Sequence, residues 1–101
     1  AYSLVLWLFP VINHIPKSHR SVLGKELEEK SLALVVAIIK ANKARGQERT
    51  NVQMQISSDL DTVRILVRMT KDLKFLSIKQ YVCGAEKINE IGLMLSAWMK
   101  T

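Results

Sequence analysis

The chain has 101 residues, which is enough for one domain with a single hydrophobic core. Hydrophobic residues make up 49% of it and aromatic residues only 6%, while fifteen Lys and Arg against nine Asp and Glu give a net charge of +6. A single cysteine, Cys83, excludes an internal disulfide, and the apolar runs are shorter than the about 20 residues that a membrane-spanning helix needs. We therefore expect a cytoplasmic protein with no membrane partner.

The first helical segment is predicted over residues 2–14. Its long aliphatic and aromatic residues make it apolar nearly all round, which predicts a helix that is buried on most faces. Pro10 lies inside the segment and has no amide donor, so we expect a kink at a cost of roughly 3 kcal/mol. Pro16 favours an extended conformation in the residue before it and ends the helix.

A basic turn over residues 16–21 leads into a second helix, predicted over residues 21–45. The first half of this helix is charged, whereas Leu32–Ile39 is apolar on every face. Lysines in the last turn suit the negative end of the helix dipole. Gly46 suits the C′ position, where a helix commonly ends in a left-handed residue.

Two capping boxes mark the starts of the remaining helices. Thr50–Gln53 predicts a third helix over residues 50–75, and Ser77–Gln80 predicts a fourth over residues 77–100. Apolar residues recur at intervals of three and four along both, which is helical periodicity and not strand alternation. The stripe expected to face the core consists of Leu60, Val63, Val67, Leu73, Leu76, Ile78, Tyr81, Val82, Ala85, Ile88, Ile91, Leu95 and Trp98.

Four helices with three short connections predict an all-α fold. We expect a single domain over residues 1–101, built as an up-down-up-down antiparallel four-helix bundle. Helices of about 25 residues make such a bundle roughly 37 Å long. In this arrangement the first and third connections share one end of the bundle, and the second connection lies at the other.

The sequence carries more apolar surface than one bundle of this size buries. The first helix and the second half of the second helix each offer two apolar faces, and further apolar residues lie off the core stripe. Large exposed apolar patches usually mark association surfaces, so we expect a homo-oligomer in which these faces pack between subunits. A tightly packed monomer with a few exposed aliphatic side chains is the alternative. The off-stripe residues are Ile65, Met69, Leu93, Met94 and Ala97.

Residues suited to catalysis or metal binding are sparse. His14 and His19 have no cysteine partner, and Asp59 and Asp61 are two residues apart on a helix and so face different ways. The sequence has no Gly-rich phosphate loop, nucleophile elbow or zinc-ligand set. Cys83 lies in mid-helix without a nearby histidine, and we interpret it as a small packing residue. The sequence therefore predicts a protein that is not an enzyme, with no catalytic residues, metal site or cofactor.

Basic residues carry the functional prediction. The net charge favours a polyanionic partner, most simply nucleic acid, although a soluble basic surface has the same charge. Arg64, Arg68 and Lys71 share one stripe of the third helix. The arginines could track a phosphate backbone or, bridged by Asp61 and Asp72, form a solvated face, and spacing alone leaves both open. The basic residues expected at the end with the first and third connections are Lys17, His19, Arg20, Lys25, Lys71, Lys74 and Lys79.

The aromatic residues of the fourth helix are not expected to contact a nucleic acid. Tyr81 and Trp98 fall on the core stripe, so we interpret them as packing residues and not as platforms for base stacking. Without exposed aromatic rings, binding of RNA or DNA would be led by phosphate contacts. Such binding tolerates many sequences and weakens as salt rises.

Three segments of the chain resemble the Avd-like family of four-helix proteins. They are FPVINHIPKSHR at Phe9–Arg20, VRILVRMTKDLKFLSIKQY at Val63–Tyr81 and EIGLMLSAW at Glu90–Trp98. The family includes the accessory variability determinants of diversity-generating retroelements. It also includes relatives encoded in intervening sequences of large-subunit ribosomal RNA genes. The resemblance covers nearly the whole chain, in order and without large gaps.

The resemblance implies a barrel-shaped homopentamer with a basic surface. Such a barrel binds the reverse transcriptase of the retroelement and nucleic acid, supports mutagenic reverse transcription, and has no catalytic activity itself. Motif matching points to Arg64 and Arg68 as functional basic residues, with Lys17 and Arg20 as secondary candidates. Leu93 departs from the pattern, because many relatives have an arginine after Glu-Ile-Gly.

Two other functions stay open at this point. The chain could be a ribosomal intervening-sequence relative that associates with RNA for an unknown purpose. It could also be a purely structural oligomer whose charges keep it soluble.

Overall fold

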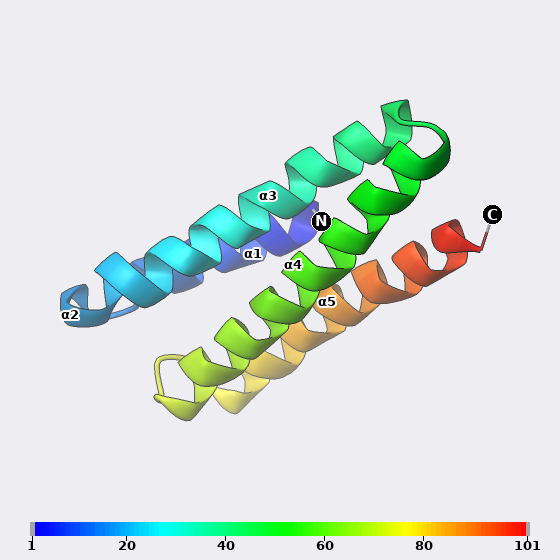
Figure 1. Cartoon of the computed structure of the whole chain (residues 1–101). Helices are drawn as coiled ribbons and strands as arrows, with labels where there is room; N and C mark the ends of the chain where they lie inside the picture. Colours follow the sequence, from blue (N-terminus) through cyan, green and yellow to red (C-terminus); the bar gives the residue numbers. More distant parts are fainter. Residues whose placement is uncertain (1, 101) are drawn as a thin grey trace.

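The computed structural model describes residues 2–100, and every regular element among them is helical. The elements are α1 (Tyr2–Asn13), α2 (Lys17–His19), the π-helical segment η1 (Arg20–Gly24), α3 (Lys25–Lys43), α4 (Gly46–Asp72) and α5 (Ile78–Met99). Because α2, η1 and α3 follow one another without a break, the chain forms four long helical stretches, as the sequence predicts (Figure 1). No helix among these residues is long and apolar enough to cross a membrane.

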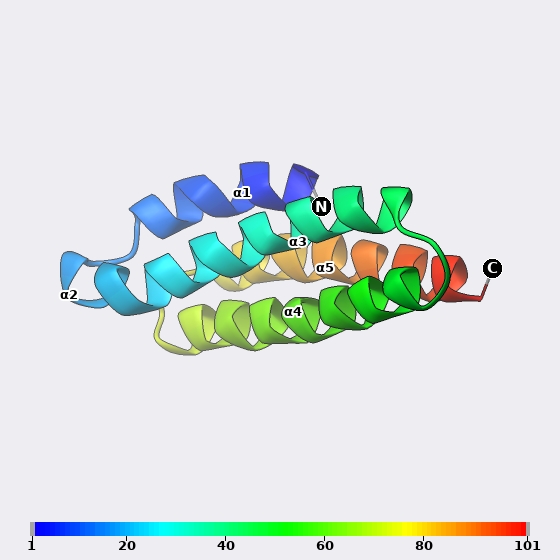
Figure 2. The same cartoon turned by 45° about the horizontal axis from the view of Figure 1, so that its top comes forward.

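The four long stretches pack as a bundle. α1 contacts α3 and α5, and α4 contacts the same two helices. Figure 2 shows α2 and the α4–α5 connection at one end, with the α3–α4 connection and the last turn of α5 at the other. The molecule is 43 Å long. This length follows from α4, because its 27 residues span roughly 40 Å at the rise of an α-helix.

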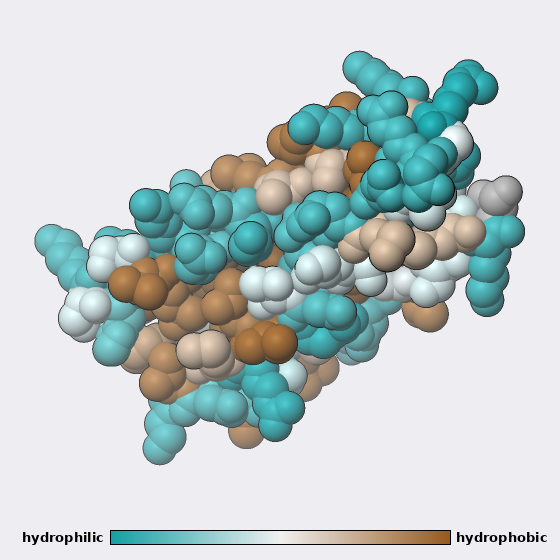
Figure 3. Space-filling view, viewed as in Figure 1, coloured by the Kyte–Doolittle hydropathy of each residue, from teal (hydrophilic) through white to brown (hydrophobic). Residues whose placement is uncertain are grey.

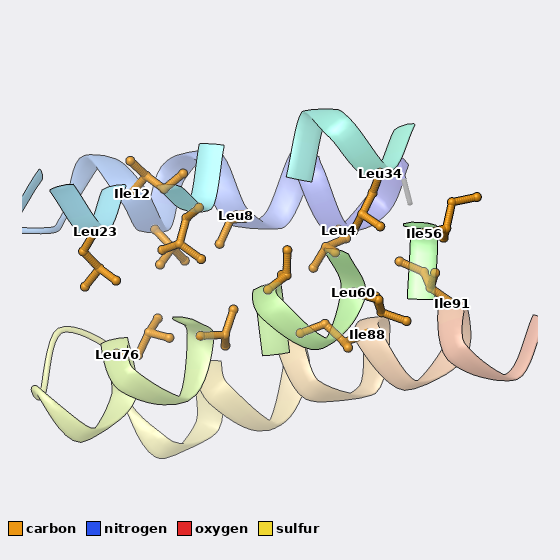
Figure 4. Packing of buried hydrophobic residues seen from close by; sticks show 14 of the residues in the cluster. Leu4, Leu8, Ile12, Leu23, Leu34, Ile56, Leu60, Leu76, Ile88 and Ile91 are labelled. Carbon is orange, nitrogen blue, oxygen red and sulfur yellow. The ribbon is translucent and has the colours of Figure 1, made fainter. Parts of the chain in front are cut away.

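The core is a continuous layer of aliphatic side chains between the helices (Figure 4). Leu4 and Leu8 of α1 are fully buried, and Ile56, Val63 and Val67 of α4 are at most 1% exposed. Burying one such side chain contributes about 1.5–3 kcal/mol, so this layer is the main source of stability. The other buried apolar residues are Val11, Ile12, Ile15, Leu23, Leu27, Leu34, Ala41, Leu60, Leu76, Ile88, Ile91 and Leu95.

α1 is less buried than its composition predicts. It turns one face to the core, while Tyr2 is 70% and Leu6 59% exposed. The half-buried Trp7 lies over Gly84 of α5, so close that a Cβ at position 84 would stand 2.8 Å from two of its ring carbons. Gly84 is therefore the place where α1 docks on α5.

The predicted basic turn over residues 16–21 is wrong, because helix begins at Lys17. Pro16 precedes this helix with φ −54°, and its missing amide is no loss at a position where helical amides have no partner anyway. The next five residues form η1, which widens the turn before α3 continues.

The predicted start of the third helix at Thr50 is also wrong. α4 begins four residues earlier, at Gly46, whose φ of +62° reverses the chain directly after α3. Thr50 then lies inside the helix, where its hydroxyl donates to the Gly46 carbonyl at 3.4 Å instead of capping amides. Gly46 has the left-handed conformation expected of it, but it opens α4 two residues after the C-cap of α3 at Ala44.

The predicted capping box of the fourth helix is confirmed. Gln80 N donates to Ser77 Oγ, and Ser77 N donates to Gln80 Oε1, both at 3.0 Å. α4 ends at Asp72, three residues before its predicted end, in a Schellman motif. In this motif Lys74 has φ 67°, Lys74 N donates to Lys71 O at 2.8 Å, and Phe75 N donates to Thr70 O at 3.0 Å.

Three residues predicted on the core stripe are exposed: Leu73 by 47%, Ile78 by 77% and Val82 by 48%. Leu73 lies after the last residue of α4. The buried face of α5 runs through Gly84, Ile88, Ile91 and Leu95, because Gly84 receives the Trp7 ring. This rotation also exposes Cys83, which is not the packing residue that the sequence suggested.

The predicted surplus of apolar surface is present. Ile65, Met69, Leu93 and Met94 are exposed by between 46% and 73%, and Ala97 is exposed as well. The second half of α3 adds Leu32, Val36 and Ile39, which are about half exposed. Tyr81 and Trp98 are half-buried against the core, as predicted.

Candidate nucleic-acid interface

A ring contact joins the start of the second helical stretch to the α4–α5 connection. His19, the last residue of α2, lies with its ring centroid 5.3 Å from that of Phe75, at an interplanar angle of 38°. Phe75 stands in the α4–α5 connection, three residues before α5 begins. We call this part of the bundle the His19–Phe75 end and define it by Lys17, His19, Lys74, Phe75 and Lys79.

Three lysines of the predicted cluster lie in the segments that meet there. Lys17 opens α2, Lys74 is in the Schellman turn and Lys79 is in the first turn of α5. All three are exposed. They therefore give the His19–Phe75 end a positive surface that a phosphate backbone can approach.

Lys71 borders this end from the last turn of α4. Its Nζ lies 4.6 Å from the centroid of the Tyr81 ring and 3.4 Å from Asp72 Oδ1. The aromatic face and the carboxylate together hold the ammonium group close to the α4–α5 junction. Tyr81 therefore packs against the core and also positions a cation.

Arg20 points away from the predicted interface. Its Nη2 donates to Asn13 O at 2.9 Å and to Ile15 O at 3.0 Å, and its Nε donates to Ile15 O at 3.2 Å. These carbonyls belong to the last residue of α1 and to a residue just after it, where backbone acceptors have no partner within the helix. The structure thus gives Arg20 a role in holding α1 to the start of η1.

Lys25 is separate from the cluster as well. It lies on the first turn of α3, and its Nζ is 4.0 Å from Glu29 Oε1. Both side chains are well exposed, so this pair contributes little to stability.

Arg64 bridges two helices farther along α4. Its Nη1 donates to Asp61 Oδ1 at 3.0 Å, and its Nη2 donates to Asn89 Oδ1 of α5 at 3.4 Å. These residues line a groove of about 530 Å³ between α4 and α5, with Gly92 on its α5 side. The guanidinium is thus fixed at the groove, with one carboxylate beside it.

Arg68 is held more loosely, since its Nε lies 3.9 Å from Asp72 Oδ2 and its side chain is 71% exposed. Along this stripe three cations, Arg64, Arg68 and Lys71, face two carboxylates, which leaves a charge of +1. The bridging of Arg64 by Asp61 and of Arg68 by Asp72, which the spacing in the sequence left open, is therefore present. Of these two arginines, Arg68 is more available to an outside anion.

Sequence reasoning misses two contacts, one at each end of the bundle. The predicted third helix includes Phe75, so the sequence does not place this residue in the connection beside His19. Arg49 is not among the predicted site residues, yet its Cζ lies 5.2 Å from the Trp98 ring centroid at the opposite end of the bundle. For the His19–Phe75 contact, the only local signal in the sequence is a lysine next to a phenylalanine just before a capping box.

The remaining polar candidates of the sequence lie in separate settings. Asp59 is buried and accepts from Gln55 Nε2 at 3.0 Å, while Asp61 is exposed, so the two carboxylates face different ways as predicted. His14 Nδ1 lies 2.7 Å from Pro10 O, at the end of α1. Among residues 2–100, no three His, Cys, Asp or Glu side chains are grouped as a metal site requires.

Comparison with known proteins identifies the family. No curated protein and no solved structure matches the chain. The model of the bAvd-like family matches residues 1–101, which is the full sequence. The chain therefore belongs to the bAvd-like family.

Proposed function

We propose that this protein is a non-catalytic accessory subunit of a diversity-generating retroelement. In this role it binds the reverse transcriptase of the element and its nucleic acid, and so supports mutagenic reverse transcription. The observation that carries the proposal is the family match over the whole chain, combined with the lysines gathered at the His19–Phe75 end. The exposed thiol of Cys83 suits a reducing, cytoplasmic environment.

The proposed mechanism is electrostatic and multivalent. Helices in up-down-up-down order would assemble into a homo-oligomer, a pentamer by the family resemblance, with the exposed apolar residues between subunits. Leu93 and Met94 on α5 and Val36 and Ile39 on α3 are candidates for these contacts, since each is at least half exposed. A ring of subunits then repeats one modest basic surface several times, which raises the affinity for a long polyanion.

The first experiment tests the partner. The protein is co-expressed with the reverse transcriptase encoded beside it, and cDNA synthesis on the element's template RNA is measured with and without the accessory chain. We expect stable co-purification and cDNA only when both proteins are present. A gene located inside a ribosomal RNA operon, with no polymerase bound, would favour the intervening-sequence alternative instead.

The second experiment tests the surface. Arg68→Ala combined with Lys74→Ala removes two exposed cations, and Lys40→Ala combined with Lys43→Ala removes the same charge at the other end of the bundle as the control. We expect the first pair to lower RNA affinity and to reduce the slope of log K against log salt by about one for each lost phosphate contact. Equal losses of RNA affinity from both pairs of substitutions would show that RNA binding depends only on the net charge of the protein.

A further inference from the structure

A hollow of about 390 Å³ opens beside the His19–Phe75 ring pair, in the face between α3 and α4. Apolar side chains form most of its lining, among them Leu23, Leu66 and Met69. Figure 3 shows such side chains gathered between α3 and α4 on the side nearer α2. The apolar lining alone does not identify a ligand for the hollow. The polar groups of the lining decide which ligand fits.

The polar lining is a hydroxyl, an imidazole and a carboxylate, from Ser18, His19 and Glu26. An apolar cavity with a few polar groups is the usual composition of a site for a small ligand. His19 adds an exposed ring at its edge, already in contact with Phe75. A base that stacks on such a ring gains energy whatever its identity, because every base has a π-face.

Two exposed lysines are close in sequence to residues that line this hollow. Lys17 is two residues before His19, and Lys74 directly follows Leu73, which also lines the hollow. Lys74 keeps φ 67°, a conformation that glycine adopts without steric cost and that other residues rarely hold. A charge at this position suits a phosphate beside the hollow.

We propose that the hollow receives one unpaired nucleobase of a bound single strand, with the flanking phosphates on Lys17 and Lys74. This inference rests on the proposed nucleic-acid function and adds the form of nucleic acid that is recognised. The Glu26 carboxylate only accepts hydrogen bonds, so it pairs with donors on the edge of the base. These donors are the exocyclic amino groups of adenine, cytosine and guanine and the ring N–H groups of guanine and uracil.

The test measures binding of RNA homopolymers of equal length, and of an RNA duplex, to the full chain. We expect the single strands to differ in affinity with the stacking strength of their bases, so that oligo-U binds most weakly. His19→Ala should weaken binding of the single strands at least about fivefold, the lower bound for loss of one stacked base, while His19→Phe keeps the ring and the affinity. Glu26→Gln should change the relative affinities of the four homopolymers, since an amide both donates and accepts whereas a carboxylate only accepts. Duplex binding should change less than twofold in all three variants.

The outcomes separate this inference from the proposed function. A chain that binds no RNA at low salt overturns both. A chain that binds RNA, but whose affinities are unchanged by His19→Ala and Glu26→Gln, overturns the base pocket and leaves the phosphate-led function standing. If either variant instead changes the mass of the particle in sedimentation, the hollow is a contact between copies of the chain, and the base pocket is rejected.

Discussion

The two ends of the bundle are built differently. At the His19–Phe75 end, side chains satisfy the helix termini: Arg20 serves the carbonyls after α1, and Ser77 and Gln80 cap α5. The opposite end, which we call the Gly46 end, reverses the chain through one glycine and leaves the start of α4 without a side-chain cap. A hollow of about 320 Å³, lined by Ile38, Ile56 and Trp98 among others, opens there.

Both ends carry positive charge, so charge alone does not distinguish them. At the Gly46 end, Arg49 lies over the Trp98 ring. At the other end three exposed lysines, Lys17, Lys74 and Lys79, lie in the segments on either side of the His19–Phe75 ring pair. The side-chain hydrogen bonds to the backbone are therefore at the end that carries the proposed binding groups. Precise recognition requires binding groups to be held in place in this way. Four sets of substitutions test this difference, from the largest expected effect to the smallest.

Gly84→Ala should have the largest effect, because it removes the site where α1 docks. The added methyl group would overlap the Trp7 ring, and overpacking of this kind costs typically 1–3 kcal/mol. We expect the free energy of unfolding in urea to fall by about 2–3 kcal/mol. Gly92→Ala is the matched control on the same helix, since its Cβ would come no closer than 3.6 Å to Leu60 Cδ2. That variant should gain up to about 1 kcal/mol from helix propensity.

The two glycine variants distinguish a clash with the Trp7 ring from a general effect on stability of replacing glycine in α5. Loss of stability of the same size in both would show that Trp7 does not constrain position 84.

Arg20→Ala should cost about 2 kcal/mol, because the partly buried carbonyl of Ile15 and the exposed carbonyl of Asn13 lose charged donors. Arg45→Ala, just before α4, is the comparison at the Gly46 end and should change stability by less than about 0.5 kcal/mol. The measurement is chemical denaturation followed by circular dichroism. If Arg20→Ala left stability unchanged but reduced RNA binding, its side chain would belong to the interface after all.

Ser77→Ala should cost about 1 kcal/mol, the usual effect of losing an N-cap hydroxyl. Thr50→Ala should change stability by less than about 0.5 kcal/mol, because that hydroxyl only bonds back to Gly46 O inside α4. Thermal unfolding of the two variants side by side gives the comparison. Equal shifts in Tm would mean that Thr50 caps a helix in solution.

These two residues show what sequence could and could not predict. Thr50–Gln53 and Ser77–Gln80 have the same spacing, but a capping box caps a helix only where the residues before it are not helical. The break at Ser77 follows the Schellman turn, whereas Gly46 has already opened α4 before Thr50. Periodicity was enough to predict four helical stretches and most of the core. Helix ends depended on left-handed residues that a hydrophobic pattern does not report.

The candidate site was predictable in part for the same reason. The lysines of the two connections follow from their order in the chain and from the expected topology. The ring pair does not, because Phe75 joins the connection only when α4 ends at Asp72. Exposure of Cys83 and Val82 was missed because Gly84, which has no side chain, sets the rotation of α5 by admitting Trp7.

Lys74→Gly should have the smallest effect on stability and the opposite sign. A glycine adopts φ 67° without the steric penalty of a side chain, so we expect a gain of about 0.5–1 kcal/mol, while Gly46→Ala at φ +62° should lose a similar amount. RNA affinity should nevertheless fall in Lys74→Gly, because the proposed phosphate contact is gone. Lys74→Ala, which loses the charge but keeps the strain, should lose the same affinity without the gain in stability. A Lys74→Gly variant that is more stable and binds RNA as tightly as the parent would show that the lysine serves neither the turn nor the interface.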